Sequence, residues 1–203
     1  MDLMTRSFHN LRNNQIQEEH LQNLYPGNVR ELAPRHWTPA DITRRAVCYL
    51  VGENEGPKVL DIGSGAGNFC LAAACYRPWA YFFGIEQRRD LVKHAEDARK
   101  KLELQNVFFM QGNFTRLDFR KFDHFYFYNS FFENLEGTDK IDATIATSPE
   151  LYDYYNLYLS RKLEEMPAGT RIATFHSLDF EIPSVYRLVK TELSALLKFW
   201  VRD

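Results

Sequence analysis

The residues best suited to chemistry lie in the stretch VLDIGSGAGNF, which runs from Val59 to Phe69. After Asp61 the stretch carries three glycines at alternate positions: Gly63, Gly65 and Gly67. Glycine has no Cβ and accepts φ > 0 at little cost, so the backbone of such a turn can approach a ligand closely. The apolar run before the turn predicts a strand, and the residues from Phe69 to Tyr76 predict a helix. The free N–H groups of that helix point toward the same place.

The spacing of the glycines selects among ligands. A GxGxxG dinucleotide turn needs glycine at position 68, where this chain has Asn68, whereas a DxGxGxG pattern fits directly. A carboxylate from Asp61 at the mouth of the turn is expected to repel a pyrophosphate and to attract an ammonium or sulfonium group. We therefore predict S-adenosylmethionine as the ligand, because it carries both cations. A glycine turn that binds nothing remains the plain alternative.

The stretch resembles the seven-strand, class I S-adenosylmethionine-dependent methyltransferases. That resemblance implies a doubly wound, Rossmann-like α/β sheet of seven strands in three layers, with an antiparallel last hairpin. We expect the cofactor to contact a threonine upstream and the residues of the turn: Thr38, Asp61, Gly63, Ser64, Gly65 and Gly67.

Two further positions are typical of nucleoside binding. Glu86 ends the predicted second strand, 19 positions beyond Gly67, where an acidic residue accepts hydrogen bonds from ribose hydroxyls in doubly wound folds. Asn113 and Phe114 follow the third predicted strand and can meet the adenine amino group and ring. The alternatives are a solvated strand end and an ordinary turn with a core phenylalanine.

The end of the fourth predicted strand carries the candidate catalytic residues, Asn129 and Phe131. In this fold that end faces the transferable methyl group. Asn129 with Phe131 and Phe132 resembles the Asn-Pro-Pro-aromatic corner of enzymes that methylate nitrogen, although both prolines are absent. We expect Asn129 to orient the acceptor lone pair in an apolar aromatic pocket that keeps an amine neutral by desolvation.

The order of motifs after Trp37 is similar to that of the non-SET histone lysine methyltransferases and their bacterial look-alikes. The motifs that carry this resemblance are GNF after the third strand, FYNSFF after the fourth, and AGTRIATFHSLDF. Asn113 stands where that family has aspartate, and Ser130 where it has a second asparagine. The resemblance implies a nitrogen acceptor, a protein lysine or another amine, but no histone substrate is carried over. Two rivals stay open: a methyltransferase-like binding protein without turnover, and a nicotinamide-dependent oxidoreductase.

Composition limits the remaining classes. The 203 residues suit one α/β domain, and a net charge of −2 with pI ≈ 6.3 gives no general nucleic-acid footprint. Three cysteines without a CxxC pair predict reduced thiols and no metal site. The chain shows neither a signal peptide nor an apolar run of membrane-spanning length, so we expect no membrane contact and a cytoplasmic protein, monomeric or a weak homodimer.

The elements that must position these residues follow from periodicity and turn signals. Residues 1–36 predict a helical cap or a polar arm, and residues 37–203 the methyltransferase domain. Thr38 is the predicted N-cap of the helix before the first strand, and Ser148-Pro149 the predicted start of the helix that ends at Pro167. The other strands after the first are predicted at Ala80–Glu86, Asn106–Gln111, Phe122–Asn129, Arg171–Phe175, Tyr186–Leu193 and Leu196–Arg202.

Overall fold

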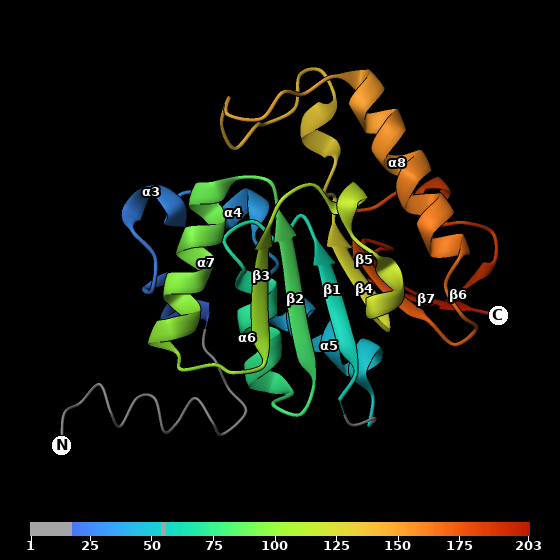
Figure 1. The fold of residues 1–203 in the computed structure, drawn as a ribbon, viewed down its shortest axis with the longest axis horizontal. Helices are drawn as coiled ribbons and strands as arrows, with labels where there is room; N and C mark the ends of the chain where they lie inside the picture. The colour runs from blue at the N-terminus through green and yellow to red at the C-terminus, as the bar shows by residue number, and fades with distance from the viewer. Residues whose placement is uncertain (1–17, 54–55) are drawn as a thin grey trace.

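The computed structural model describes residues 18–53 and 56–203. The strands run β1 (Lys58–Ile62), β2 (Tyr81–Glu86), β3 (Val107–Gln111), β4 (His124–Tyr128), β5 (Arg171–Phe175), β6 (Tyr186–Glu192) and β7 (Leu197–Arg202). They form one sheet in the order β3-β2-β1-β4-β5-β7-β6 (Figure 1). The first five strands are parallel, and β7 pairs antiparallel with both β5 and β6. The predicted fold class, with its antiparallel last hairpin, is confirmed.

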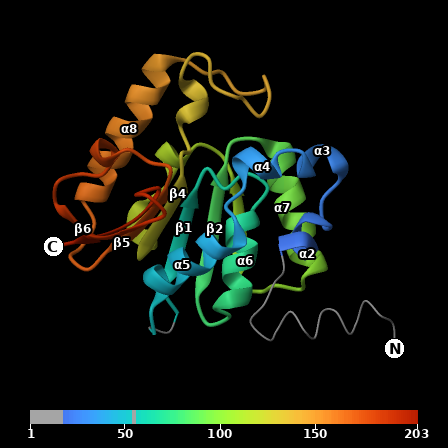
Figure 2. The same ribbon diagram turned by 180° about the vertical axis from the view of Figure 1, so that it is seen from behind.

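Helices cover the two faces of the sheet unequally. The α-helices are α2 (Glu18–Gln22), α3 (Gly27–Arg30), α4 (Ala33–His36), α5 (Ala40–Val51), α6 (Asn68–Tyr76), α7 (Arg89–Lys101) and α8 (Pro149–Glu164). Single 3-10 turns are η1 (Phe114–Arg116), η2 (Phe119–Lys121), η3 (Phe132–Asn134) and η4 (Asp179–Glu181). Core residues of α5, α6 and α7 pack together on one face, and those of α8 pack on the other (Figures 1 and 2).

The alternation of side chains along β4 shows how the strands separate these two cores. Phe125 and Phe127 belong to the core under α8, whereas Tyr126 between them packs with the α5–α7 side and stacks on Phe69 at 3.7 Å. Successive strand residues point to opposite faces, so a strand buried on both faces must be apolar nearly throughout. This is why the run FDHFYFYN predicted a central strand.

The segment before α5 packs against the sheet domain. Leu21, Tyr25, Val29 and Trp37 are buried in the same core as α5 and α6. The Tyr25 hydroxyl donates a hydrogen bond of 2.8 Å to the Ala66 carbonyl in the glycine turn. Within residues 18–36 the chain therefore forms helices that support the turn. The apolar positions of the predicted cap that precede residue 18 lie outside the described residues.

The ends of the helices match the capping predictions in part. Ser148 caps α8, because its Oγ accepts a hydrogen bond from the Leu151 amide at 3.2 Å. The prediction that Thr38 caps α5 is wrong: Pro39 occupies the N-cap, and the Thr38 hydroxyl instead shares a hydrogen bond of 2.8 Å with the Tyr126 hydroxyl. No helix in residues 18–53 and 56–203 is long and apolar enough to cross a bilayer.

Candidate functional site

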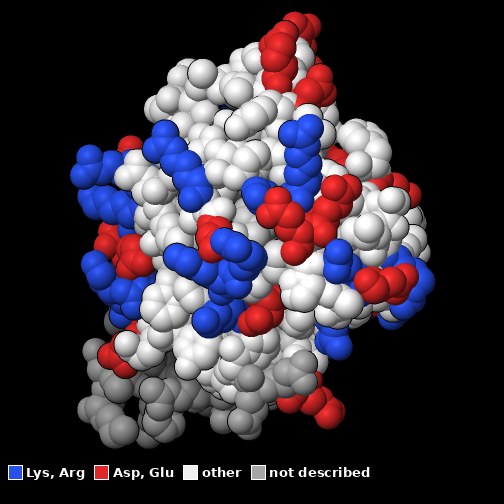
Figure 3. Space-filling model, turned by 45° about the vertical axis from the view of Figure 1, so that its right-hand side comes forward, with Lys and Arg blue, Asp and Glu red and all other residues white. Residues whose placement is uncertain are grey.

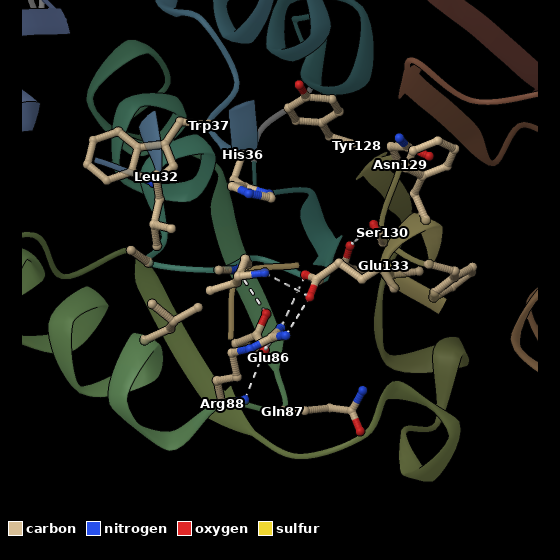
Figure 4. Close-up of a pocket in the computed structure, with 18 of the residues that line it drawn as sticks. Leu32, His36, Trp37, Glu86, Gln87, Arg88, Tyr128, Asn129, Ser130 and Glu133 are labelled. Atoms are coloured by element: carbon tan, nitrogen blue, oxygen red, sulfur yellow. Dashed lines mark hydrogen bonds and ion pairs between the residues drawn. The ribbon is translucent and has the colours of Figure 1, made fainter. Parts of the chain in front are cut away.

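A cavity of about 490 Å³ lies at the carboxyl ends of the parallel strands (Figure 4). Its walls are the glycine turn after β1, the end of β2, the turn after β3, the corner after β4 and residues of α4. The chain leaves β1 toward β2 on one side and reaches β4 on the other, so this is the point where the strand order reverses. Open α/β sheets bind ligands at this point, and the volume is in the range of small-molecule sites.

Six of the predicted site residues line this cavity: Gly63, Gly65, Glu86, Phe114, Asn129 and Phe131. They come from four different loops, and the parallel strands bring them together because the carboxyl ends of those strands meet at one edge of the sheet. Their positions agree with the predicted site, and their individual roles stay predictions.

The glycine turn contains three residues with positive φ, at +77° for Gly63, +53° for Gly65 and +84° for Gly67. A Cβ added at Gly65 would meet no atom within 4 Å, so this glycine opens onto free space. A Cβ at Gly67 would lie 2.5 Å from the Phe109 ring and 2.9 Å from Ala95. Gly65 thus lets a ligand approach, whereas Gly67 lets α6 pack closely against its neighbours.

Glu86 is 7% exposed and lies on the cavity wall. Its Oε2 accepts a hydrogen bond from the Gly65 amide at 3.2 Å, and its Oε1 accepts one from the Arg88 amide at 2.9 Å. Burial raises the pKa of Glu86, and these hydrogen bonds with the nearby Arg88 guanidinium oppose that rise. The carboxyl is therefore fixed beside the glycine turn, where two hydroxyls of a ribose can reach it.

Asp61 does not lie at the mouth of the turn, and this corrects the electrostatic argument made from the sequence. Val59 and Asp61 share one face of β1, the face covered by α6, and the Asp61 carboxylate accepts a hydrogen bond from the Cys70 thiol at 3.6 Å. Burial raises its pKa to about 8. The side chain is buried and is not among the residues that line the cavity, and its burial favours the protonated form.

The cavity lining also leaves out Thr38, Ser64 and Asn113. Thr38 bonds Tyr126 through its hydroxyl and accepts a hydrogen bond from the Asn68 amide through its carbonyl, at 2.9 Å. Ser64 is buried, and its Oγ has no partner among the described residues. These residues are not among those that line the cavity, and their predicted cofactor contacts stay predictions.

Asn113 holds the far wall together instead of facing the cavity. Its Oδ1 accepts a hydrogen bond from the Thr115 amide at 3.0 Å, and its Nδ2 donates to the Tyr155 hydroxyl at 2.8 Å and to Gln87 Oε1 at 3.2 Å. Phe114 stacks on Phe131 at 5.0 Å, so the turn after β3 and the corner after β4 share one aromatic cluster.

The corner after β4 presents the candidate catalytic amide. Asn129 has φ +47°, a left-handed conformation that asparagine adopts more readily than most residues. Its side chain lines the cavity without a hydrogen-bond partner among residues 18–53 and 56–203. Phe131 is buried beside it, and Phe132 is 44% exposed. A free amide between aromatic rings can hold a substrate nitrogen.

Several wall residues were missed by the sequence analysis: Leu32, Pro34, Arg35, His36, Trp37, Gln87, Arg88, Glu133 and Asp139. Burial lowers the pKa of His36 and of His176, which favours their neutral forms. The three residues of α4 reach the cavity only because the N-terminal segment folds back over the sheet, and no local pattern shows that. An arginine directly after the acidic end of β2 was a usable signal for Arg88.

The loop between β4 and α8 gives the mouth of the cavity a negative charge. Residues 133–148 contain one basic residue, Lys140, and four acidic ones, Glu133, Glu136, Asp139 and Asp142, which we call the acidic rim. Figure 3 shows acidic side chains at the top of the molecule, where Figure 1 places this loop. Arg35 pairs with Asp139 at 2.8 Å, and Arg88 pairs with Glu133 and Asp142. Three of the four rim carboxylates are thus paired with arginines that line the cavity, and Glu136 has no ion pair among the described residues.

Comparison with known proteins identifies the domain. A family described as a methyltransferase domain matches residues 53–154. A tRNA (guanine-N(7)-)-methyltransferase of Synechococcus sp. (strain JA-3-3Ab) is 36% identical over 95 residues, which are 47% of this chain and 36% of the relative. One of Microcystis aeruginosa is 44% identical over 57 residues, 28% of this chain and 27% of the relative. The matches thus span about a third of the length of these curated relatives.

Two solved structures share the fold. An RNA methyltransferase from Salinibacter ruber, in complex with S-adenosyl-L-homocysteine, has a TM-score of 0.57 at 24% identity over 82% of this chain and 94% of that one. TrmN from Thermus thermophilus has a TM-score of 0.60 at 17% identity over 86% of this chain and 52% of that one. The glycine turn, the strand order and the domain match agree with the predicted cofactor. The chain therefore belongs to the methyltransferase domain family and has its class I fold, which uses S-adenosylmethionine.

Proposed function

We propose that the protein is an S-adenosylmethionine-dependent methyltransferase that transfers the methyl group to a nitrogen acceptor, an amine that is cationic when free. The single observation that carries this proposal is the unpartnered Asn129 amide, which lies on the same cavity wall as the glycine turn and Glu86. The cofactor side and the acceptor side thus share one cavity. Such an arrangement can hold a nucleophile in line with a sulfonium methyl group.

The residues present fit the cofactor. Gly65 opens onto free space at the cavity wall, so a ligand can lie against the backbone there and reach the carboxylate of Glu86. When bound, S-adenosylmethionine supplies an electrophilic methyl group on a cationic sulfur. Glu86 and the acidic rim favour a cation in the cleft, and the N–H groups at the start of α6 can donate hydrogen bonds to the carboxylate of the cofactor.

The surroundings of Asn129 favour an amine as the acceptor. An ammonium group is attracted by the acidic rim and can then lose its proton inside the cavity, because the buried rings of Phe114 and Phe131 disfavour the charged form. His36 and His176 line the same cavity, and burial lowers the pKa of both, which favours neutral imidazoles that can accept that proton. The Asn129 carbonyl oxygen then holds the neutral amine by accepting a hydrogen bond from its N–H, which leaves the nitrogen lone pair free to attack the methyl carbon.

A second candidate acceptor is the N7 atom of guanine in tRNA. It is favoured by the tRNA (guanine-N(7)-)-methyltransferases that match about half of this chain or less. Against it stand the acidic rim and the net charge of −2, since binding to a phosphate backbone depends on basic side chains. The relatives reported above do not include lysine methyltransferases, so the finer resemblance to that family stays a proposal that rests on the motif order.

Transfer of a labelled methyl group separates the candidates. The protein is incubated with methyl-labelled S-adenosylmethionine in parallel reactions, which contain a lysine-rich peptide, a set of small polyamines or bulk tRNA. We expect label in the peptide or the amines and none in tRNA. Label in N7-methylguanine selects the second candidate, and the absence of cofactor binding by calorimetry removes the proposed function altogether.

A charge reversal in the acidic rim sharpens this test. Glu136 is exposed on the rim, and Asp97 is equally exposed on α7. We expect Glu136→Lys to raise KM for a cationic acceptor several-fold, because it replaces attraction by repulsion at the mouth of the cleft. Asp97→Lys makes the same change of net charge and should leave KM unchanged. Equal effects of the two variants contradict a cation-selective mouth.

A further inference from the structure

Arg88 is a buried arginine whose guanidinium lies among three carboxylates. It precedes α7, its side chain is 9% exposed, and it pairs with Glu86 at 3.8 Å, Glu133 at 2.5 Å and Asp142 at 3.1 Å. Figure 4 shows the guanidinium between Glu86 and Glu133. A charge withdrawn this far from water is stable only where its partners are fixed, so the arrangement is specific.

The contact with Glu133 has the geometry that only an arginine gives. Nη1 donates to Oε1 at 3.3 Å and Nη2 donates to Oε2 at 2.5 Å, so the two planar groups meet through two parallel hydrogen bonds. Nε of the same guanidinium donates to Asp142 Oδ1 at 3.1 Å. A lysine has one charged nitrogen and cannot make these contacts together.

The three carboxylates belong to opposite sides of the cleft. Glu86 ends β2 and bonds the glycine turn, which is the cofactor side. Glu133 and Asp142 lie on the segment 133–142, which follows the Asn129 corner, and Glu133 also accepts a hydrogen bond from the Ile141 amide at 3.2 Å. Both Glu133 and Ile141 line the cavity, so this segment forms the acceptor side.

We infer that Arg88 is a positioning residue that joins the cofactor side of the cleft to the acceptor side. Its backbone amide and guanidinium orient the Glu86 carboxylate, and the same guanidinium fixes the segment 133–142 over the cavity. A ligand that binds to the Glu86 carboxylate therefore enters a cleft whose acceptor wall is already in place. Loss of Arg88 leaves three carboxylates without their shared cation, and both walls then move apart by repulsion. This inference rests on the proposed function.

The test compares Arg88→Met and Arg88→Lys with Arg45→Met as a matched control. Arg45 also pairs with two carboxylates, those of Asp41 and Glu192, but is not part of the cavity wall. Calorimetry measures the affinity for S-adenosylhomocysteine, and hydrogen exchange measures the protection that this ligand gives to residues 133–142. Neither readout needs an acceptor substrate.

We expect Arg88→Met to weaken binding about ten-fold and to abolish ligand-induced protection of the segment. Arg88→Lys should restore part of the affinity without the protection, and Arg45→Met should resemble the unmodified protein in both. Adding Glu133→Gln to Arg88→Met should restore part of the affinity, because it removes one of the three carboxylates that repel one another once Arg88 is lost.

The outcomes separate the inference from the proposed function. If the unmodified protein binds no S-adenosylhomocysteine, the proposed function fails. If it binds, and Arg88→Met folds and keeps both the affinity and the protection of residues 133–142, the function stands and the role of Arg88 is wrong. A loss of thermal stability in Arg88→Met with unchanged binding likewise contradicts the inference, because it indicates a purely structural residue.

Discussion

The Ser130 hydroxyl donates a hydrogen bond to the backbone carbonyl of Ile62, at the point where β1 ends and the glycine turn begins. Because β1 and β4 are adjacent parallel strands, this bond joins the corner that carries Asn129 to the turn that is expected to hold the cofactor. The contact is close: a Cβ added at Gly63 would lie 2.9 Å from Ser130 Cβ. The acceptor corner and the cofactor turn are thus packed as one unit.

The first prediction concerns Gly63, which has positive φ and no room for a side chain. Gly63→Ala combines a strained backbone, which costs about 1–3 kcal/mol, with a contact that pushes Ser130 away from Ile62. We expect a loss of unfolding free energy above about 2 kcal/mol in urea, and at least a ten-fold loss of affinity for S-adenosylmethionine.

Gly169→Ala is the matched control. Gly169 also has positive φ, at +86°, but a Cβ there meets no atom within 4 Å, and the residue is not on the cavity wall. Gly169→Ala should lose only the unfolding free energy that the strained backbone costs, and it should keep its affinity for S-adenosylmethionine. Equal losses of stability in the two variants would show that the contact between Gly63 and Ser130 contributes nothing.

The second prediction concerns Glu86. A carboxylate that accepts hydrogen bonds from ribose hydroxyls contributes about 1.5–3 kcal/mol to binding, so Glu86→Ala should weaken S-adenosylmethionine binding by roughly ten- to a hundred-fold. Calorimetry measures this directly, with Asp97→Ala on the exposed face of α7 as the control. Unchanged affinity in Glu86→Ala would mean that the carboxylate serves only to hold the Gly65 and Arg88 amides.

Several predicted ligand residues, among them Asp61 and Asn113, lie off the cavity wall because sequence spacing does not give the direction of a side chain. The strands were predictable, since apolar runs such as the one at β4 have few other solutions, and the glycine pattern located the turn. Asp61, however, lies on the face of β1 that α6 covers, and Asn113 is held by Tyr155 of α8. Both facts depend on how elements pack, which periodicity does not specify.

The missed residues reach the cleft through long-range contacts. Arg88 is held in the cleft by hydrogen bonds to Glu133 and Asp142, which are 45 and 54 positions away in the sequence. Trp37 and His36 face the cavity because Tyr25, which packs on Trp37 at 4.8 Å, anchors the N-terminal segment to the glycine turn. The sequence therefore predicts the cofactor half of the site better than its walls.

The third prediction concerns the pH dependence of stability. Burial raises the pKa of Asp61 to about 8 from an ordinary value of 3.8. Between these values the folded state keeps a proton that the unfolded state has lost, so unfolding free energy falls as pH rises, by up to about 1.4 kcal/mol per pH unit. The stability that protonated Asp61 contributes is fully present below the ordinary pKa of 3.8 and is lost as pH rises through the folded-state pKa of about 8.

Asp61→Asn tests this, because an amide is neutral throughout. Urea unfolding of both proteins from about pH 5 to pH 8 should show the stability of the unmodified protein falling relative to that of Asp61→Asn. Parallel pH profiles would show that Asp61 titrates in the folded protein as it does in the unfolded chain.

The last prediction concerns Asn129 and separates cofactor binding from chemistry. Its amide lines the cavity without a partner among the described residues, whereas the contacts expected to hold the cofactor come from the glycine turn and Glu86. For Asn129→Ala we expect cofactor affinity to change by less than about ten-fold and the methyl-transfer rate to fall by roughly a hundred-fold, because the nitrogen is no longer held in line. Asn129→Gly tests the backbone separately, since glycine also adopts the φ of +47°. Rates at saturating cofactor with the acceptor found in the labelling experiment decide the matter, and normal turnover in both variants would place the acceptor against another wall of the cleft.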